Sequence, residues 1–372
     1  MKHRMVRTVS VAFALALFFA CAGAAFAEEK IQLAILLDTS NSMDGLIDQA
    51  KSQLWKVVNE LARAKRNGRR PELEVALFEY GNDGLRQSEG YLRMVSDLTT
   101  DLDRISEKLF GLVTNGGEEF CGAVIGRAVD RLSWSRSDDV LKVVYIAGNE
   151  PFDQGYESYK ASAARAAKKG IVVNTIFCGD YGEGVATFWK DGAIRAEGRY
   201  LSIDQDEVVE DIATPFDADI VRLGEELNAT YVGYGREGEA SKSRQEEQDR
   251  NAAGMGAEAS VQRSVAKAQG AYVNEKWDLA DAVQRGAVKI GSLKDDELPA
   301  EMRKMSLPER EKYVAGLAAR RAELQGKINA LNEQRRVYVE AQLKTRAGNT
   351  TLGEAILLAV QEQAKLKGFV LE

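Results

Sequence analysis

Short apolar runs alternate with amphipathic stretches between residue 30 and about residue 205. Residues 33–37 are apolar without interruption, as in a strand buried on both faces of a sheet. Residues 45–65 then place apolar side chains at the spacing of one helix face. The same patterns predict strands at 73–80, 91–95, 141–147, 171–178 and 199–203, and helices at 100–112, 122–132, 156–169 and 184–193. This order predicts an α/β fold with a doubly wound, mostly parallel sheet flanked by helices, in which 91–95 is antiparallel.

The composition changes after about residue 235. Residues 236–250 are rich in charge and lack large apolar side chains, so we expect a solvated helix or linker there. This charged segment, with short helices, extends to residue 305. Ser306 and Glu309 then fit a capping box at the start of a longer helix. We therefore divide the chain into residues 1–27, 28–235 with a trailing helix, 236–305 and 306–372.

The C-terminal region, 306–372, has a partial heptad pattern. Its apolar residues at every seventh position are Leu317, Leu324, Leu331 and Tyr338. Arg321 and Arg335 interrupt the neighbouring heptad position. The pattern fits a helical hairpin or short coiled coil, with 350–367 as the returning helix, and it fits equally an amphipathic helix lying on the preceding domain.

Residues 1–27 have the pattern of a secretory signal peptide. A cationic start precedes the apolar residues 11–20, and Ala25-Phe26-Ala27 forms a small-x-small cleavage pattern. We predict an exported protein, periplasmic or secreted. An uncleaved anchor and a lipoprotein attached at Cys21 are less favoured alternatives, the latter because residues 18–20 fit lipid attachment poorly. No later stretch has 18 uninterrupted apolar residues, so we expect no membrane-spanning segment in the mature chain.

The composition excludes several classes of function. The only histidine among the 372 residues is His3, which lies in the predicted signal peptide. A mature chain without histidine has no Ser-His-Asp or Cys-His catalysis and no histidine-based metal site. The net charge of −7 argues against nucleic acid as a main partner.

One short motif follows the first predicted strand. It reads Asp38-Thr39-Ser40-Asn41-Ser42, which is D-x-S-x-S between a buried strand and an amphipathic helix. Ligands of an open α/β sheet bind at the carboxyl ends of its strands. A carboxylate and two hydroxyls there are hard oxygen ligands, which suit Mg²⁺ or Mn²⁺ and are poor for zinc.

With this motif in this context, residues 30 to about 205 resemble a von Willebrand factor A (VWA) domain. Asp38, Ser40 and Ser42 match the first segment of that family's metal-ion-dependent adhesion site (MIDAS). The resemblance implies a divalent cation at the upper edge of the sheet. It also implies a partner protein whose carboxylate fills the open coordination position of that cation.

The remaining segments depart from the family pattern. The second segment usually supplies a threonine, but Glu118 and Glu119 occupy that region here. The third usually has an aspartate where this chain has Gly148, so Asn149 or Glu150 are the expected substitutes. The competing interpretation is a degenerate site that keeps the fold and binds partners without metal.

Two cysteines remain after the predicted signal peptide. Cys121 begins the third predicted helix and Cys178 ends the fifth predicted strand, both at the edge where Asp38 lies. In an exported protein this pair suggests a disulfide, and two free buried thiols are the alternative.

These observations lead to a protein-interaction module, not an enzyme, that binds a partner through a divalent cation. The alternative is a metal-free structural or scaffold protein of the cell envelope, which acts through its helical C-terminal region and forms homo-oligomers there. A third reading, a metal-dependent hydrolase with the glutamates as base, has no further motif to support it.

Overall fold

The structure of the chain is a computed structural model that describes residues 29–204, 212–343 and 352–371. The predicted signal peptide, Cys21 included, lies outside the described residues. The six strands of the main sheet are β1 (Lys30–Asp38), β3 (Glu72–Tyr80), β4 (Leu92–Thr99), β5 (Leu141–Gly148), β6 (Ile171–Cys178) and β7 (Tyr200–Ile203).

Their order in the sheet is β4-β3-β1-β5-β6-β7. All neighbours are parallel except β4, which pairs antiparallel with β3 at the sheet's edge. The central strands β1 and β5 are buried along almost their whole length, which explains their uninterrupted apolar runs. The predicted α/β, doubly wound and mostly parallel sheet is confirmed.

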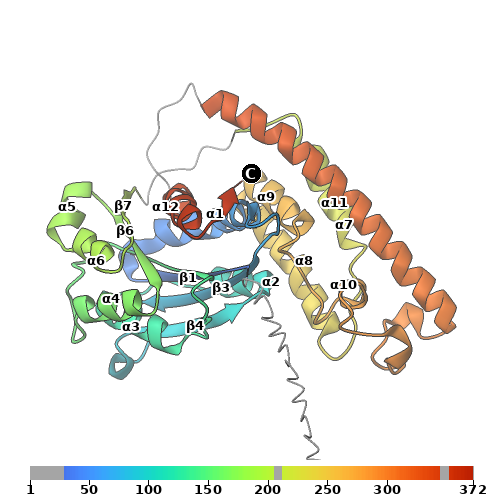
Figure 1. Cartoon of the computed structure of the whole chain (residues 1–372), viewed down its shortest axis with the longest axis horizontal. Coiled ribbons are helices and arrows are strands. Elements are labelled where there is room, and N and C mark those ends of the chain that lie inside the picture. Colours follow the sequence, from blue (N-terminus) through green and yellow to red (C-terminus); the bar gives the residue numbers. More distant parts are fainter. Residues whose placement is uncertain (1–28, 205–211, 344–351, 372) are drawn as a thin grey trace, which may run out of the picture.

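Helices cover both faces of this sheet (Figure 1). One face packs against α1 (Asp44–Ala62) and α2 (Leu102–Phe110), and the other against α3 (Cys121–Arg131), α4 (Tyr159–Lys168) and α6 (Trp189–Arg195). The predicted helix at 184–193 is in fact two helices, α5 (Tyr181–Ala186) and α6, because Phe188 between them has a left-handed backbone with φ of 72°. Short 3-10 turns are η1 (Asn41–Met43), η2 (Gln87–Glu89), η3 (Ile290–Ser292) and η4 (Ala300–Met302).

A helical region follows the sheet and packs beside α1 and α2. Its helices are α7 (Asp217–Asn228), α8 (Gly238–Met255), α9 (Ala257–Ala268), α10 (Leu279–Gln284) and α11 (Leu307–Leu343). The expected helix at 236–250 is present as α8, but it is not solvated on all sides, because it packs against α2 and α9. Its inner face is polar but hydrogen-bonded: Ser106 donates to Gln248 (2.8 Å) and Gln245 donates to the hydroxyl of Tyr272 (3.0 Å).

Helix α11 starts at the predicted capping box, in which the Ser306 N–H donates to Glu309 at 2.7 Å. The two arginines that interrupt its heptad are buried and face other helices. Arg321 pairs with Asp278 at 2.6 Å, and Arg335 pairs with Asp217 at 2.9 Å. Helix α11 thus lies on α7, α9 and α10, as expected for an amphipathic helix that lies on the preceding domain.

The expectation that 350–367 returns along α11 as a hairpin is wrong. Helix α12 (Leu352–Leu366) packs instead against α1, β5, β6 and β7 (Figure 1). The hydroxyl of Tyr145 donates to the carbonyl of Ile356 at 3.1 Å, and the side-chain amides of Asn174 and Gln363 pair in both directions. Burial of apolar surface explains the position of α12. Helices α3, α4 and α6 all lie on the opposite face of the sheet, so α12 covers the part of this face over β5, β6 and β7.

Beyond α12, the short strand β8 (Val370–Leu371) pairs antiparallel with β2 (Ala64–Lys65) directly after α1. The sheet domain therefore also includes residues 352–371, which the division of the chain at residue 235 had placed in a separate region. None of the described helices is both long and apolar enough to cross a membrane.

Candidate metal centre

The first segment of the candidate site forms the turn from β1 into α1. Asp38 is fully buried, and its Oδ1 accepts the backbone N–H of Ser40 at 2.8 Å. The hydroxyl oxygens of Ser40 and Ser42 are 3.2 Å apart. Among the described residues, Asp38 Oδ2 has no hydrogen-bond partner although it is buried. A buried carboxylate oxygen without a donor is costly, so it marks a place where a ligand can bind.

The second segment brings one of the two predicted glutamates to this turn. Glu119 is 7% exposed, whereas Glu118 points to solvent. Gly81, directly after β3, lies between the two carboxylates: a Cβ on it would be 2.7 Å from Asp38 Oδ1 and 2.9 Å from Glu119 Cγ. Gly81 therefore allows Asp38 and Glu119 to approach, which nothing in the sequence pattern indicated.

The third segment explains why a glycine stands where the family has an aspartate. A Cβ at Gly148 would collide with the hydroxyl of Tyr80 and lie 3.0 Å from Asp38 Oδ2. That hydroxyl donates to the carbonyl of Ala147 at 2.9 Å, so Tyr80 fills the space that a side chain at 148 would need. The sequence did not indicate a role for Tyr80 in the site, because its position at the end of an apolar strand is typical of an ordinary core residue.

The two expected substitutes in the third segment differ. Asn149 reaches the first segment, since its side-chain amide donates to Ser42 at 3.3 Å, and its Oδ1 is buried without a partner among the described residues. Glu150 is half-buried and accepts a hydrogen bond from Gln154 at 3.1 Å. The structure therefore brings together Asp38, Ser40, Ser42, Glu119 and Asn149, and leaves Glu118 and Glu150 around them.

The electrostatics of the site favour a cation. Burial, opposed by hydrogen bonds from Ser40 and reinforced by the charges of Glu119 and Glu150, raises the pKa of Asp38 to about 8. Burial and the charge of Glu150 likewise raise the pKa of Glu119 to about 7. A divalent cation would stabilise both ionised carboxylates.

The donor set fits a hard cation only in part. Carboxylate, hydroxyl and amide oxygens suit Mg²⁺ or Mn²⁺. However, no group of three or more His, Cys, Asp or Glu side chains that could hold a metal occurs in the described part of the chain. A cation here would depend on the two serines and Asn149 beside Asp38 and Glu119.

These shifts predict how the stability of the metal-free protein depends on pH. A carboxyl whose pKa is raised in the folded state keeps protons that the unfolded chain releases, so stability falls as pH rises from about 4 to about 8. We expect the free energy of unfolding of Asp38→Asn to fall less with rising pH than that of the wild type. Urea unfolding of both proteins in EDTA at pH 5, 6, 7 and 8 measures these free energies. Equal slopes for the wild type and the variant would contradict the burial of an ionisable Asp38.

The predicted disulfide between Cys121 and Cys178 is wrong, because both are free and buried. Cys121 packs in the apolar cluster under α3 and α4, and Cys178 packs in the cluster under α1 and α12. The sheet lies between the two clusters, so the side chains point to opposite faces. Burial raises the pKa of both thiols, which keeps them protonated.

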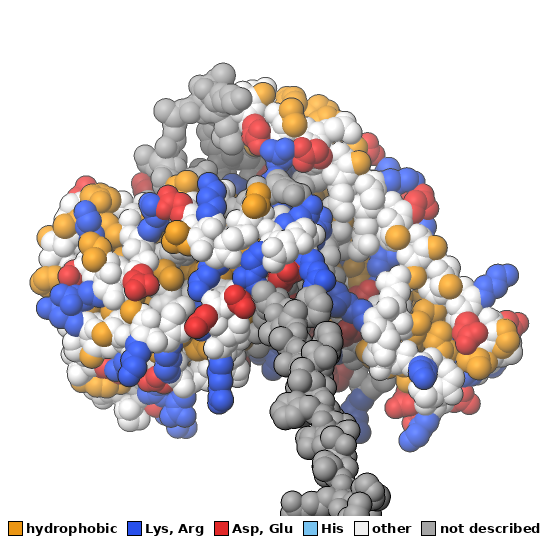
Figure 2. All heavy atoms as spheres, viewed as in Figure 1, with side chains coloured by type: hydrophobic (Ala, Val, Ile, Leu, Met, Phe, Trp, Pro, Cys, Tyr) orange, Lys and Arg blue, Asp and Glu red, His pale blue; other side chains and the backbone are white. Residues whose placement is uncertain are grey.

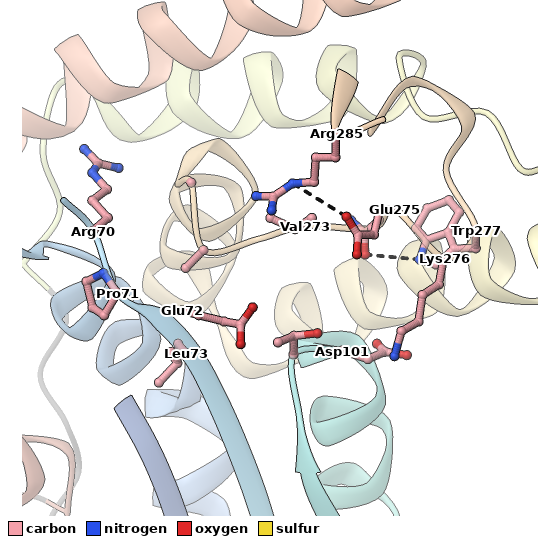
Figure 3. A pocket seen from close by; sticks show the side chains of 14 residues that line it. Arg70, Pro71, Glu72, Leu73, Asp101, Val273, Glu275, Lys276, Trp277 and Arg285 are labelled. Atoms are coloured by element: carbon pink, nitrogen blue, oxygen red, sulfur yellow. Dashed lines mark hydrogen bonds and ion pairs between the residues drawn. The ribbon is translucent and has the colours of Figure 1, made fainter. Parts of the chain in front are cut away.

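A cavity of about 210 Å³ lies at the opposite edge of the sheet (Figure 3). It is between the start of β3 and the loop after α9, and Arg285 and Glu275 form an ion pair of 4.0 Å beside it. None of the predicted site residues lines it.

The strand order, the antiparallel edge strand and the helices on both faces give residues 30–203, together with α12 and β8, a VWA-like fold. The candidate metal centre lies at the carboxyl ends of its strands. No sequence-family profile matches the chain. No curated protein matches it either.

Solved structures do match. The SpRpn10 VWA domain is 17% identical, with a TM-score of 0.36, over 47% of this chain and 88% of that one. BatB from Bacteroides thetaiotaomicron is 18% identical, with a TM-score of 0.36, over 47% of this chain and 90% of that one. Proximal thread matrix protein 1 from the mussel byssus, described with a zinc-occupied MIDAS motif, is 16% identical, with a TM-score of 0.36, over 49% of this chain and 43% of that one.

Proposed function

We propose that this protein is an exported interaction module, not an enzyme, that binds a partner protein through Mg²⁺ or Mn²⁺ at the candidate metal centre. The observation that carries the proposal is the buried Oδ2 of Asp38, which has no partner among the described residues. The same turn holds Ser40 and Ser42, and Glu119 and Asn149 approach it from two other loops. The cation would satisfy this oxygen and offset the raised pKa values of the two buried carboxyls.

Asp38, Ser40, Ser42, Glu119 and Asn149 are the residues that would hold the cation. When bound, the cation supplies a vacant position for an anionic oxygen, for which a carboxylate of a partner protein is suited. The chain's own residues orient the site: the Ser40 N–H holds Asp38 in place, and the Asn149 amide holds the hydroxyl of Ser42. Glu118 and Glu150 contribute negative charge near the site but are not needed as ligands.

The alternative, a metal-free scaffold that acts through its helical C-terminal region, is favoured by one observation. The described residues contain no cluster of three or more side chains of the usual metal-ligand types. Against it, α11 uses its buried arginines to bind its own chain. Among the described residues on the face drawn in Figure 2, side chains of both charges are interspersed and apolar ones form only small groups, so they offer no broad apolar surface to a second copy.

Titration calorimetry of Mg²⁺ and Mn²⁺ into metal-stripped protein tests the proposal. The whole mature chain is needed, because α12 covers part of the sheet. We expect one-site binding that Asp38→Ala abolishes. The matched control is Asp138→Asn, which removes an exposed carboxylate before β5 at the opposite edge of the sheet and should leave binding unchanged. Absence of binding by the wild type would refute the proposal and favour the metal-free alternative.

A further inference from the structure

Three aromatic side chains stand together on the loops of the candidate metal centre. The ring centroids of Tyr91 and Phe120 are 6.2 Å apart, and those of Phe120 and Tyr156 are 5.8 Å apart with nearly perpendicular planes. Tyr156 is 67% exposed, and the other two are half-buried. We call Tyr91, Phe120 and Tyr156 the aromatic shelf.

The backbone of these loops is shaped to hold the shelf. Gly155 has φ of +93°, and a Cβ on it would lie 2.6 Å from two carbons of the Phe120 ring. Tyr91 itself has a positive φ of 53°, which is uncommon for a residue with a side chain. An exposed tyrosine that packs on two half-buried aromatic rings, in loops with an unusual backbone, is more than a stray surface side chain, because such conformations cost free energy.

The shelf adjoins the candidate cation. Phe120 directly follows Glu119, and Tyr156 belongs to the loop that begins with Asn149. The carbonyl of Tyr91 accepts the N–H of Gly81 at 2.9 Å, and Gly81 touches both Asp38 and Glu119. A polypeptide bound to the cation through one carboxylate would therefore place a neighbouring side chain on the shelf.

The same loops are strongly acidic. Residues 39–44, 81–91, 113–120 and 149–158 contain one cationic side chain, Arg86, which lies 3.6 Å from Glu89. Their acidic residues are Asp44, Asp83, Glu89, Glu118, Glu119, Glu150, Asp153 and Glu157, of which Glu157 forms an ion pair with Arg165 of α4. We call these acidic loop residues the acidic rim. One bound divalent cation does not neutralise the acidic rim, which would therefore repel a partner that offered a carboxylate without compensating cations.

We propose, on the basis of the proposed function, that the partner is a polypeptide segment with a specific side-chain pattern. It offers one carboxylate to the cation, an adjacent aromatic or large aliphatic side chain to the aromatic shelf, and flanking Lys or Arg residues to the acidic rim. The carboxylate supplies attachment, whereas the shelf and the rim select among carboxylates.

The test uses a displayed library of heptapeptides with aspartate fixed at the centre and random flanks, selected on the mature chain in Mg²⁺. We expect enrichment of aromatic or large aliphatic residues beside the aspartate, and of Lys and Arg farther out. For a synthetic peptide of the enriched class, Tyr156→Ala should weaken binding roughly two- to twelvefold, since an aromatic contact contributes about 0.5–1.5 kcal/mol. Tyr181→Ala, an exposed tyrosine on α5, is the control and should bind like the wild type.

The outcomes separate this inference from the proposed function. If calorimetry shows metal binding but the flanks are random, or Tyr156→Ala binds as tightly as the wild type, the shelf inference is overturned and the metal centre stands. Enriched peptides that bind equally well in EDTA and still depend on Tyr156 overturn the metal centre and support the shelf. Failure of both metal and peptide binding overturns both.

Discussion

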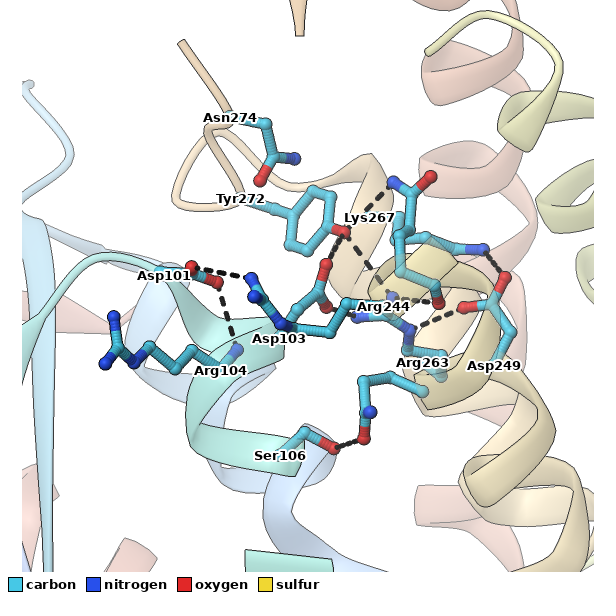
Figure 4. A network of polar contacts seen from close by, with 12 residues as sticks. Asp101, Asp103, Arg104, Ser106, Arg244, Asp249, Arg263, Lys267, Tyr272 and Asn274 are labelled. Carbon is cyan, nitrogen blue, oxygen red and sulfur yellow. Dashed lines mark hydrogen bonds and ion pairs between the residues drawn. The ribbon is translucent and has the colours of Figure 1, made fainter. Parts of the chain in front are cut away.

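Replacing Arg263 with methionine is expected to lower the free energy of unfolding by about 3–5 kcal/mol. The guanidinium of Arg263 is buried between the sheet domain and the helical region (Figure 4). It pairs with Asp103 of α2 at 2.6 Å and with Asp249 of α8 at 2.7 Å, and it lies 4.4 Å from the ring centroid of Trp55. Without it, the buried carboxylate of Asp103 loses its cationic partner, whereas Asp249 keeps the hydrogen bonds from Lys267 and Asn228.

The direction of this effect follows from the network around Arg263. Burial alone would raise the pKa of Asp249, but Arg263 and Lys267 lower it to about 2. Tyr272 also donates to Asp103, at 2.6 Å, so several groups depend on one cation. Breaking a buried ion pair from one side costs more than removing both partners. We therefore expect Asp103→Leu combined with Arg263→Met to recover part of the loss.

Urea unfolding followed by circular dichroism measures this prediction. The matched control is Arg250→Met, because Arg250 is 65% exposed and pairs with Glu247 on the surface of α8. An exposed pair contributes at most about 1 kcal/mol. A loss for Arg263→Met no larger than that of the control would mean that the helical region is not held to the sheet domain by this network.

Replacing Val360 with aspartate is expected to lower the free energy of unfolding by about 4 kcal/mol or more. Val360 lies on the inner face of α12 and is 2% exposed, in one apolar cluster with Ile356 and Ala359. The charge must either stay buried without a partner or pull α12 off the sheet. In the second case the apolar surfaces of α1 and β6 become exposed to water.

The control for this variant lies on the same helix. Leu358 is 53% exposed, so Leu358→Asp adds the same charge on the outer face and should change stability by less than about 0.5 kcal/mol. Urea unfolding compares the two, and binding of a hydrophobic dye reports exposed apolar surface. If both variants were as stable as the wild type, α12 would not be part of the core.

Most of the sheet could be predicted from local patterns. The continuous apolar runs of β1 and β5 exist because both strands are buried on two faces, and that condition is visible in sequence. The D-x-S-x-S motif could be placed at the sheet edge for the same reason, since it directly follows a recognisable strand. Which of Glu118 and Glu119 turns inward could not be predicted, because loop residues have no periodicity.

The amino-acid sequence by itself determined the α/β alternation, the turn that places Asp38, Ser40 and Ser42 at the carboxyl edge, and the capped start of α11. These features depend on neighbours in the chain. The tertiary structure alone decided that Tyr80 occupies the space beside Gly148, that Cys121 and Cys178 face opposite sides, and that α12 closes the sheet. Each of these depends on which distant surfaces meet, and burial of apolar area selects that partner without a local signal.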